Sequence, residues 1–433
     1  MSFGFKHTRK ASLGAGSLAV KQHYSCNNPS AFVFVPCRAP EDQVGNYQMK
    51  IDKKKPKHWF YLVLFVVYVV VGICVRWIKG ATANSVTLYG HKLNGNLRAL
   101  YVYIKVNETG LSAEYLTLDP LHHRDLCAAG EKCRSALSVK DVIAVCRSAC
   151  IVTDHGPHAL VLLNKLSSAV FVDVWHGIPF KGYDAKDFTW LHGYRATFVP
   201  SPSMKCIYEH RNGFRPEQIF VTGYGRTDRL VSEAYDGSEI KERLQIDEGS
   251  GKIVLFAPTW SHGVRDETNT PFRMSEEEFF ARLNDFGLIH GCLILFRTHL
   301  NSEVIGVHNV PQIKFVPIST YLDTEGLLYI SDVLVSDWSS IVFDYLVLHR
   351  PTVFIDIDAP FDKGFSYGPE YRFGPIVDDL DSLLQAIGEA CATPDKVLGR
   401  YGEKMAAVAT EVYANYADGL ATKRYVETLK GLL

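Results

Sequence analysis

The stretch from Ile330 to Asp358 constrains the fold of this chain more than any other segment. It reads ISDVLVSDWSSIVFDYLVLHRPTVFIDID, a β-branched run, a Ser-Ser pair with a helical pattern behind it, and a second apolar run opened by Pro351. The apolar residues after Ser339 recur at helical spacing, and the two flanking runs have the length of buried strands. Strand, helix and strand in this order predict a βαβ unit and hence a parallel sheet.

Ser339 and Ser340 stand at the predicted N-terminus of the helix in this unit. Free backbone N–H groups and the positive end of the helix dipole favour an anion at such a position, and two hydroxyls add hydrogen-bond donors. The pair therefore predicts a phosphate-binding site. The ordinary alternative is that one serine only caps the helix, because serine is a favoured N-cap residue.

The remaining chain alternates strand and helix patterns in two series, which predicts two doubly wound α/β domains. We expect a first domain over residues 84–225, a second over residues 226–394, and a hinge near Gly223 to Leu230. Such sheets bind ligands beyond the carboxyl ends of their strands, so two of them facing each other predict a cleft. With 433 residues, 47% of them hydrophobic, the chain is long enough to bury both cores.

An uncharged apolar segment runs from Trp59 to Val75. At ~1.5 Å per residue it reaches ~25 Å, just short of a hydrocarbon core, so residues 58–79 are predicted to form a membrane anchor. Residues 1–57 before it show no periodicity and are predicted to be a disordered basic tail, in which Met49 is an alternative start.

The lysines before the anchor outnumber the basic residues after it, so a spanning helix would leave the N-terminus in the cytoplasm and the domains outside. An anchor lying within one leaflet would instead keep both flanks in the cytoplasm, and its marginal length favours this second arrangement.

Charge and cysteine content exclude other classes of protein. A formal net charge of -1 argues against a nucleic-acid partner. Ten cysteines are too few for a disulfide scaffold in a chain of this length. The group Cys127, Cys133, Cys146 and Cys150 matches no zinc spacing, so these residues are expected to be buried thiols in a reducing compartment.

Polar side chains follow predicted strands in both domains. The run VDVWHG ends a strand with His176, near Lys181, and FRTH repeats the arrangement with Arg297 and His299. A histidine at a strand end is a candidate acid or base, since its charge changes near neutral pH. The alternatives are a carboxylate partner for Arg297 and a loop hydrogen bond for His299.

Six motifs in order resemble the CDP-glycerol glycerophosphotransferases of teichoic-acid and capsule synthesis. They are WHGIPFKG, GYGRTDRL, FAPTW, RTH, SDWSSIVFDY and GPIV, between about Val86 and about Val377. The resemblance implies a GT-B fold, with residues 395–433 packing back on the first domain. It also implies a catalytic domain on the cytoplasmic face of the cell membrane, and transfer of glycerol phosphate from CDP-glycerol to a hydroxyl of a lipid-linked or polymeric acceptor.

The resemblance also assigns roles by motif position. The two motif histidines, His176 and His299, become the principal active-site groups, and His176 is our candidate base because it lies in the acceptor-side domain. The serine pair holds the donor pyrophosphate, and Lys181 and Arg297 supply positive charge. Asp344 binds a hydroxyl of ribose or glycerol, or makes an ordinary structural hydrogen bond.

No metal or cofactor is demanded by these motifs, although a divalent cation on the pyrophosphate is compatible with them. Three other functions share the pattern: a CDP-ribitol ribitolphosphotransferase, a GT-B glycosyltransferase with a nucleotide-sugar donor, and a non-catalytic membrane-bound nucleotide sensor. Glycerol and ribitol differ only in the pocket depth that they need, so the sequence does not separate them. Neither the acceptor nor the oligomeric state is marked in the sequence.

Overall fold

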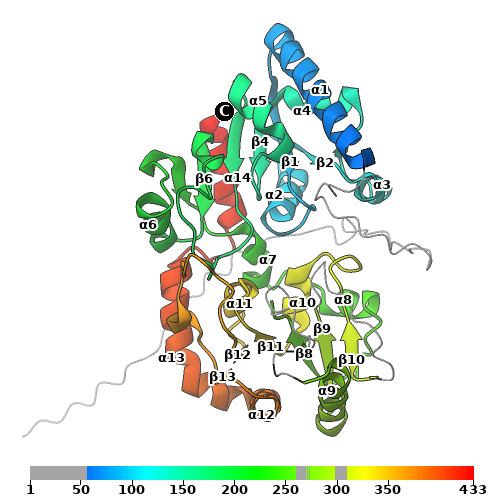
Figure 1. Ribbon diagram of the computed structural model, residues 1–433, viewed down its shortest axis with the longest axis vertical. Coiled ribbons are helices and arrows are strands. Elements are labelled where there is room, and N and C mark those ends of the chain that lie inside the picture. Colours follow the sequence, from blue (N-terminus) through cyan, green and yellow to red (C-terminus); the bar gives the residue numbers. More distant parts are fainter. Residues whose placement is uncertain (1–55, 260–269, 271, 273, 298–309) are drawn as a thin grey trace, which may run out of the picture.

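A computed structural model describes residues 56–259, 270, 272, 274–297 and 310–433. The predicted tail lies almost entirely outside the described residues. Two parallel sheets, each covered by helices, form two domains that face each other (Figure 1). The predicted fold class is therefore confirmed.

In the described part of the chain the first sheet has seven parallel strands in the order β3-β2-β1-β4-β5-β6-β7. Strands β4 to β6 are mostly buried because helices cover both faces of the sheet. The strands are β1 (Thr82–Tyr89), β2 (Ser112–Thr117), β3 (Cys133–Ser135), β4 (Ser148–Thr153), β5 (Val170–Asp173), β6 (Ala196–Val199) and β7 (Ile219–Val221).

Helices and short 3-10 turns connect these strands. They are α1 (Pro56–Lys79), α2 (Gly95–Val106), α3 (Pro120–Ala128), α4 (Val139–Cys146), η2 (His158–Leu160), α5 (Val161–Leu166), η3 (Leu191–Gly193), α6 (Pro202–His210), η4 (Pro216–Gln218) and η5 (Gly225–Thr227).

The described residues form a second sheet of six parallel strands in the order β10-β9-β8-β11-β12-β13. The strands are β8 (Lys252–Phe256), β9 (Cys292–Phe296), β10 (Ile313–Phe315), β11 (Val333–Ser336), β12 (Thr352–Ile355) and β13 (Ile376–Val377). The helical elements are α7 (Asp228–Val231), α8 (Gly237–Arg243), α9 (Glu276–His290), α10 (Thr324–Ile330), α11 (Ile341–Leu346), η7 (Pro369–Tyr371), α12 (Leu380–Ala392), α13 (Pro394–Tyr413) and α14 (Ala421–Leu432).

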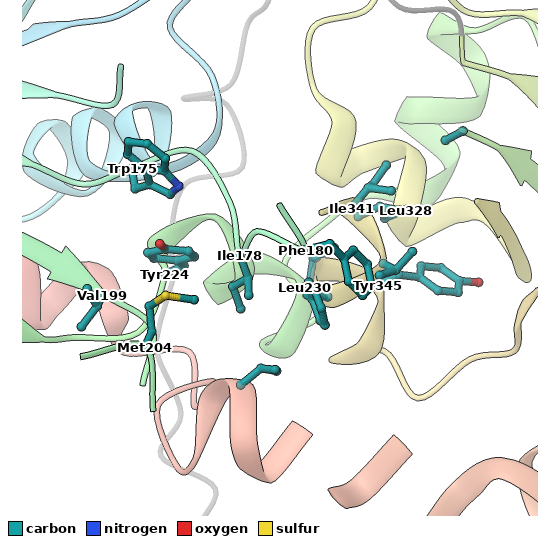
Figure 2. Close-up of a cluster of buried hydrophobic side chains, with 14 of the residues drawn as sticks. Trp175, Ile178, Phe180, Val199, Met204, Tyr224, Leu230, Leu328, Ile341 and Tyr345 are labelled. Carbon is teal, nitrogen blue, oxygen red and sulfur yellow. The ribbon is translucent and has the colours of Figure 1, made fainter. Parts of the chain in front are cut away.

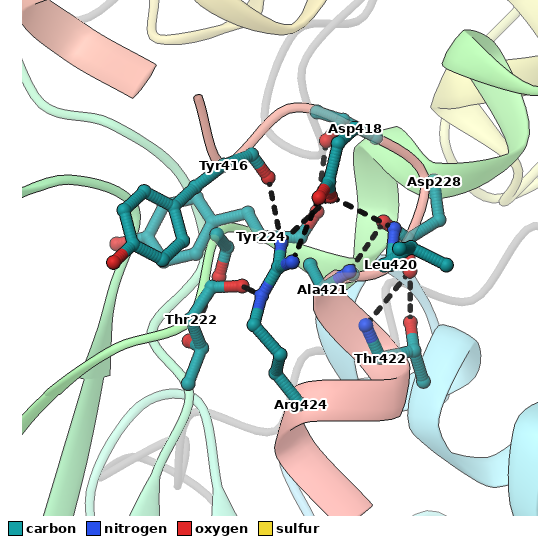
Figure 3. A network of polar contacts seen from close by, with 12 residues as sticks. Thr222, Tyr224, Asp228, Tyr416, Asp418, Leu420, Ala421, Thr422 and Arg424 are labelled. Atoms are coloured by element: carbon teal, nitrogen blue, oxygen red, sulfur yellow. Dashed lines mark hydrogen bonds and ion pairs between the residues drawn. The ribbon is translucent and has the colours of Figure 1, made fainter. Parts of the chain in front are cut away.

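The last helix, α14, returns to the first domain and binds the segment between the two sheets (Figure 3). Arg424 Nε donates to the carbonyl of Thr222 over 2.7 Å. The carboxylate of Asp228 accepts hydrogen bonds from the backbone N–H groups of Ala421 and Thr422. The end of the chain thus restrains the hinge region between the domains.

Aromatic packing joins the two domains across their boundary (Figure 2). Phe180, which follows β5 of the first domain, lies 5.5 Å from the ring of Trp338 and 4.6 Å from the ring of Phe343. All three side chains are buried. Because apolar contact area is lost when the domains separate, this cluster favours the arrangement that places the two sheet edges together.

Helix α1 lies along the first domain, against α4 and α5, rather than projecting from it (Figure 1). Phe65, Val69 and Ile73, spaced by four residues, form its buried face. Near its end, Arg76 is buried and donates to the carbonyls of Cys146 and Ser148 over 3.0 and 2.6 Å. One side of the helix is therefore committed to protein contacts.

Substituting Gly72 tests this docking. A Cβ atom on Gly72 would lie 2.5 Å from Cys146 Sγ, so Gly72→Leu should lower the free energy of unfolding by roughly 1–3 kcal/mol. Leucine raises intrinsic helix propensity, so the loss can only come from packing. Urea unfolding measures the effect, with Val71→Leu on the exposed side of α1 as the neutral control. Equal stability of the two variants would mean that α1 is not packed on α4.

Candidate active site

A cavity of about 140 Å³ lies at the carboxyl edge of the second sheet, with Arg226 of the segment between the two sheets on its wall. A larger cavity of about 370 Å³ lies at the amino ends of β5, β6 and β7, away from the predicted site residues. Because parallel sheets bind ligands at their carboxyl edges, the smaller cavity is the candidate site. Its lining residues are Arg226, Ala257, Pro258, Thr259, Arg297, Ile318, Thr324, Ser339, Ser340 and Ile341.

Arg297 follows β9 directly and contributes a buried guanidinium to this cavity. Its Nη1 donates to the carbonyls of Val316 and Tyr321, and its Nη2 donates to Thr324 Oγ1 over 2.9 Å. Nε has no hydrogen-bond partner among the described residues. Burial lowers the pKa of Arg297 to about 10, so the group still carries its charge at neutral pH. The arrangement leaves a fixed positive charge with donor capacity at the cavity.

The serine pair lies in the turn between β11 and α11, on the same cavity. Helix α11 begins at Ile341, so Ser340 occupies the N-cap position, and its side chain makes no capping hydrogen bond. The expectation that one serine acts only as a cap is therefore not met for Ser340. Both hydroxyls are partly exposed and border the cavity that contains Arg297.

The loop after β5 brings the WHG motif to the same place. Trp175 has φ 50° and Gly177 has φ 144°, which turns the chain sharply at the strand end. A Cβ atom on Gly177 would lie 3.0 Å from Ser340 Oγ and 3.4 Å from a guanidinium nitrogen of Arg226. Glycine therefore permits the His176 loop of the first domain to touch the serine turn of the second.

His176 is held by the backbone of the preceding strand loop. Its Nδ1 lies 2.9 Å from the carbonyl oxygen of Asp154 and donates to it, which leaves Nε2 unprotonated in the neutral ring. Removal from water lowers the pKa of His176 to about 3, and the neighbouring His155 adds to the shift. His176 is thus neutral near pH 7, and its Nε2 carries no proton.

Three further histidines surround this imidazole. The ring of His155 stacks on His176 with centroids 4.1 Å apart and planes 9° apart. His91 lies 4.3 Å from His155 and 5.7 Å from His158. Sequence reasoning missed this cluster because its members come from the ends of two neighbouring strands, β1 and β4; the TDHGPH run after β4 was the available signal.

Arg226, also missed, joins the two domains at the site. Its Nη1 donates to the carbonyl of His176 over 2.6 Å, while Nη2 lies 2.6 Å from Glu325 Oε1 and 3.1 Å from Asp344 Oδ2. The backbone N–H of Arg226 donates to Asn96 Oδ1. The side-chain amide of Asn96 in turn donates to the carbonyls of Val174 and Trp175. The arginine of the GYGRTD motif was the available sequence signal.

Asp344 was predicted to bind a ribose or glycerol hydroxyl, with a structural role as the alternative. The side chain is fully buried, pairs with Arg226 and does not line the cavity. Burial raises its pKa to about 7, against the opposing effect of Arg226. Neither carboxylate oxygen has a hydrogen-bond partner in the described part of the chain, so both roles of Asp344 stay predictions.

Lys181, another predicted residue, does not line the cavity. The Lys181 side chain is exposed, with Nζ 5.4 Å from the Tyr183 ring, while its backbone bridges to Phe365 of the second domain. His299 lies outside the described residues, so its position relative to His176 stays a prediction.

Comparison with known proteins identifies the family of this chain. Residues 74–431 match the family described as CDP-glycerol:poly(glycerophosphate) glycerophosphotransferase. The teichoic acid ribitol-phosphate polymerase TarK of Staphylococcus aureus is 26% identical over 297 residues, 64% of this chain and 55% of the relative. A teichoic acid glycerol-phosphate transferase of the same species is 29% identical over 299 residues, 62% of this chain and 72% of the relative. The chain spans only about half the length of TarK and of the similar polymerase TarL.

Solved structures show the same fold. The wall teichoic acid polymerase TagF superposes with a TM-score of 0.71 at 20% identity, covering 87% of this chain and 96% of that chain. The UDP-GlcNAc 2-epimerase from Neisseria meningitidis superposes with a TM-score of 0.50 at 15% identity, covering 80% and 99% of the two chains. These likenesses show the two-domain GT-B architecture.

The stacked histidines predict how His176 titrates. In the wild type its NMR signal should stay that of a neutral imidazole from pH 8 down to pH 5, because the pKa is lowered to about 3. His155→Ala removes the stacked ring and admits water, so the pKa of His176 should rise towards ~6.5. His155→Phe keeps the stacked ring and should leave His176 neutral at pH 5. Signals are assigned with His176→Ala, and a wild-type midpoint near pH 6.5 would contradict the described environment.

Proposed function

Because the chain belongs to the CDP-glycerol:poly(glycerophosphate) glycerophosphotransferase family, we propose that it transfers glycerol phosphate from CDP-glycerol to an acceptor hydroxyl and releases CMP. The observation that carries the proposal is the contact between the His176 loop and the serine turn at the cavity of Arg297. A base from one domain and phosphate-binding groups from the other thereby share one site.

We assign the donor pyrophosphate to Arg297, Ser339 and Ser340. The cavity of about 140 Å³ is smaller than the ~300 Å³ at which small-molecule pockets begin, so it suits the phosphate groups rather than the whole nucleotide. Within the described residues the buried Arg297 has an N–H without a partner, and with the two serine hydroxyls at the cavity it forms a donor set that matches phosphate oxygens. Lys181, whose side chain is exposed, would add positive charge towards the donor phosphates.

The chemistry follows from these positions. Nε2 of His176 takes the proton of the acceptor hydroxyl, whose oxygen attacks the phosphorus nearest glycerol. The bond from that phosphorus to the bridging oxygen breaks, and CMP leaves with the electron pair. Arg297 and the serine hydroxyls stabilise the negative charge that develops, and His299 is proposed to act with them. For Asp344 we propose a positioning role through Arg226 instead of a contact with the donor.

The acceptor is proposed to be a lipid-linked or polymeric hydroxyl in the synthesis of a teichoic-acid-like or capsular polymer. The chemistry proposed for the described residues requires no metal or cofactor, and a divalent cation on the pyrophosphate is compatible with it. A second donor, CDP-ribitol, has specific support, because TarK and TarL are ribitol-phosphate polymerases. A nucleotide-sugar transferase and a non-catalytic nucleotide sensor share the fold but are not suggested by the family.

Membrane attachment is proposed through α1, lying in the plane of one leaflet on the cytoplasmic face. Over the described residues one helix, Trp59–Lys79, is long and apolar enough to cross a membrane. A spanning helix would need to leave the first domain and expose the buried Arg76. The free side of α1 carries Val63, Val67 and Val70, which are 60%, 50% and 46% exposed. An amphipathic contact of this kind keeps both domains on the side where the CDP-linked donor is available.

Release of CMP from CDP-glycerol tests the transferase. The purified chain with a lipid-linked glycerol-phosphate acceptor should release CMP. His176→Ala and His299→Ala should each lower kcat/KM by ~10²–10⁴-fold, because each removes a side chain proposed to act in the transition state. His210→Ala, an exposed histidine on α6, is the control and should retain activity. Activity with CDP-ribitol alone would change the donor only. Full activity of the His176→Ala variant would refute the assigned base.

The membrane proposal predicts the effect of polar residues on the free side of α1. Replacing Val63, Val67 and Val70 together by Asn should release the protein from anionic liposomes in a flotation assay, with unchanged thermal unfolding. The control is Leu288→Asn with Ile289→Asn, two exposed apolar residues of α9 in the second domain. If α1 spans the bilayer, the triple variant will stay membrane-bound after carbonate extraction, and the in-plane arrangement is wrong.

A further inference from the structure

Three potential metal ligands gather on the first domain, away from the candidate active site. His123 and Cys127 lie four residues apart on α3, and Cys133 opens the edge strand β3. One ligand atom from each lies within 4.8 Å of the other two. Among the described residues this is the one group of His, Cys, Asp and Glu side chains with such spacing.

The distances suit a tetrahedral ion. Cys127 Sγ lies 3.7 Å from His123 Nε2 and 3.0 Å from Cys133 Sγ. Zinc bonds of ~2.3 Å to sulfur and ~2.0 Å to nitrogen require ligand separations of about 3.5 to 3.8 Å. The sulfur to nitrogen distance already lies in this range, and a small rotation of one thiol opens the sulfur pair to it.

Local structure brings the ligands together. Residues four apart on a helix share one face, so His123 and Cys127 point the same way. A tight turn follows, in which the backbone N–H of Gly130 donates to the carbonyl of Cys127, and Cys133 returns beside the helix end. The motif H-x3-C-x5-C thus joins a helix to an edge strand, a spacing that sequence patterns for zinc do not contain.

Among the described residues the cluster holds three ligands and no carboxylate. Glu131, the nearby carboxylate, already pairs with Arg98 and Lys105 at 2.9 and 2.7 Å, so it is not free to complete the site.

We propose that His123, Cys127 and Cys133 bind one zinc ion, with water in the fourth position. Binding displaces one proton from each thiol, so two protons leave as the ion enters, and the neutral imidazole supplies the third ligand. The ion links helix α3 to β3, which is an edge strand of the first sheet. The cluster shares no residue with the cavity of Arg297, so the ion takes no part in the proposed transfer.

Cobalt substitution tests the site on the full-length protein. The metal-free, reduced protein titrated with Co²⁺ should develop a thiolate charge-transfer band that saturates at one ion per chain and is displaced by Zn²⁺. His123→Ala, Cys127→Ser and Cys133→Ser should each weaken binding by more than the ~10–100-fold lost when a hydrogen-bond partner of a ligand is removed. Zinc should also raise the unfolding temperature of the wild type but not that of these variants. The unfolding transition of each variant shows that it folds without zinc.

The chain offers a matched control. Cys206 and His210 are likewise four residues apart on α6, with Sγ 3.5 Å from Nδ1, and no third ligand completes them in the described part of the chain. Cys206→Ser should therefore bind cobalt as the wild type does. Loss of the band in Cys206→Ser, its persistence in Cys127→Ser, or a Cys127–Cys133 disulfide in peptide mapping of protein purified without oxidant would each overturn the proposal.

Discussion

The position of the two domains, and with it the candidate site, depends on one buried guanidinium. Arg226 binds the carbonyl of His176 on one side and the carboxylates of Glu325 and Asp344 on the other. Removing one partner of such a buried pair costs about 3–5 kcal/mol, because the remaining charge stays without water. Apolar packing around Phe180 favours closed domains in general, whereas this ion cluster specifies which atoms meet.

The ion cluster of Arg226, Glu325 and Asp344 contains more negative than positive charge, so its stability depends on pH. Two buried carboxylates face one arginine, and burial raises the pKa of Asp344 to about 7. A carboxyl group with a raised folded pKa holds a proton that the unfolded chain has lost, so its contribution to stability is present at low pH and declines as pH rises through 7. The interface is therefore most stable when the pair shares a proton, on the acidic side of neutrality.

Much of the fold was predictable from sequence, because buried parallel strands are short apolar runs. The two predicted series of strands and helices correspond to the two sheets, whereas edge strands such as Cys133–Ser135 and Ile376–Val377 are too short to show a pattern. In the site, Arg297 and the serine pair follow strand ends and were found in that way. Arg226 and His155 were not, because their partners lie on other elements and only the folded chain brings them together.

Helix α1, which is proposed to attach the protein to a membrane, and the candidate base His176 belong to one continuous piece of structure, which bears on how the proposed lipid-linked acceptor would be reached. Helix α1 packs against η2, and His158 of η2 begins a row of rings that passes through His91 and His155 to His176. Each step in this row is shorter than 6 Å between centroids. With α1 in the bilayer surface, the base would therefore lie at a fixed, short distance from the lipid. An acceptor held in the membrane by its lipid would then need little free chain to bring a hydroxyl to His176, whereas a domain on a flexible tether would have to find it by diffusion.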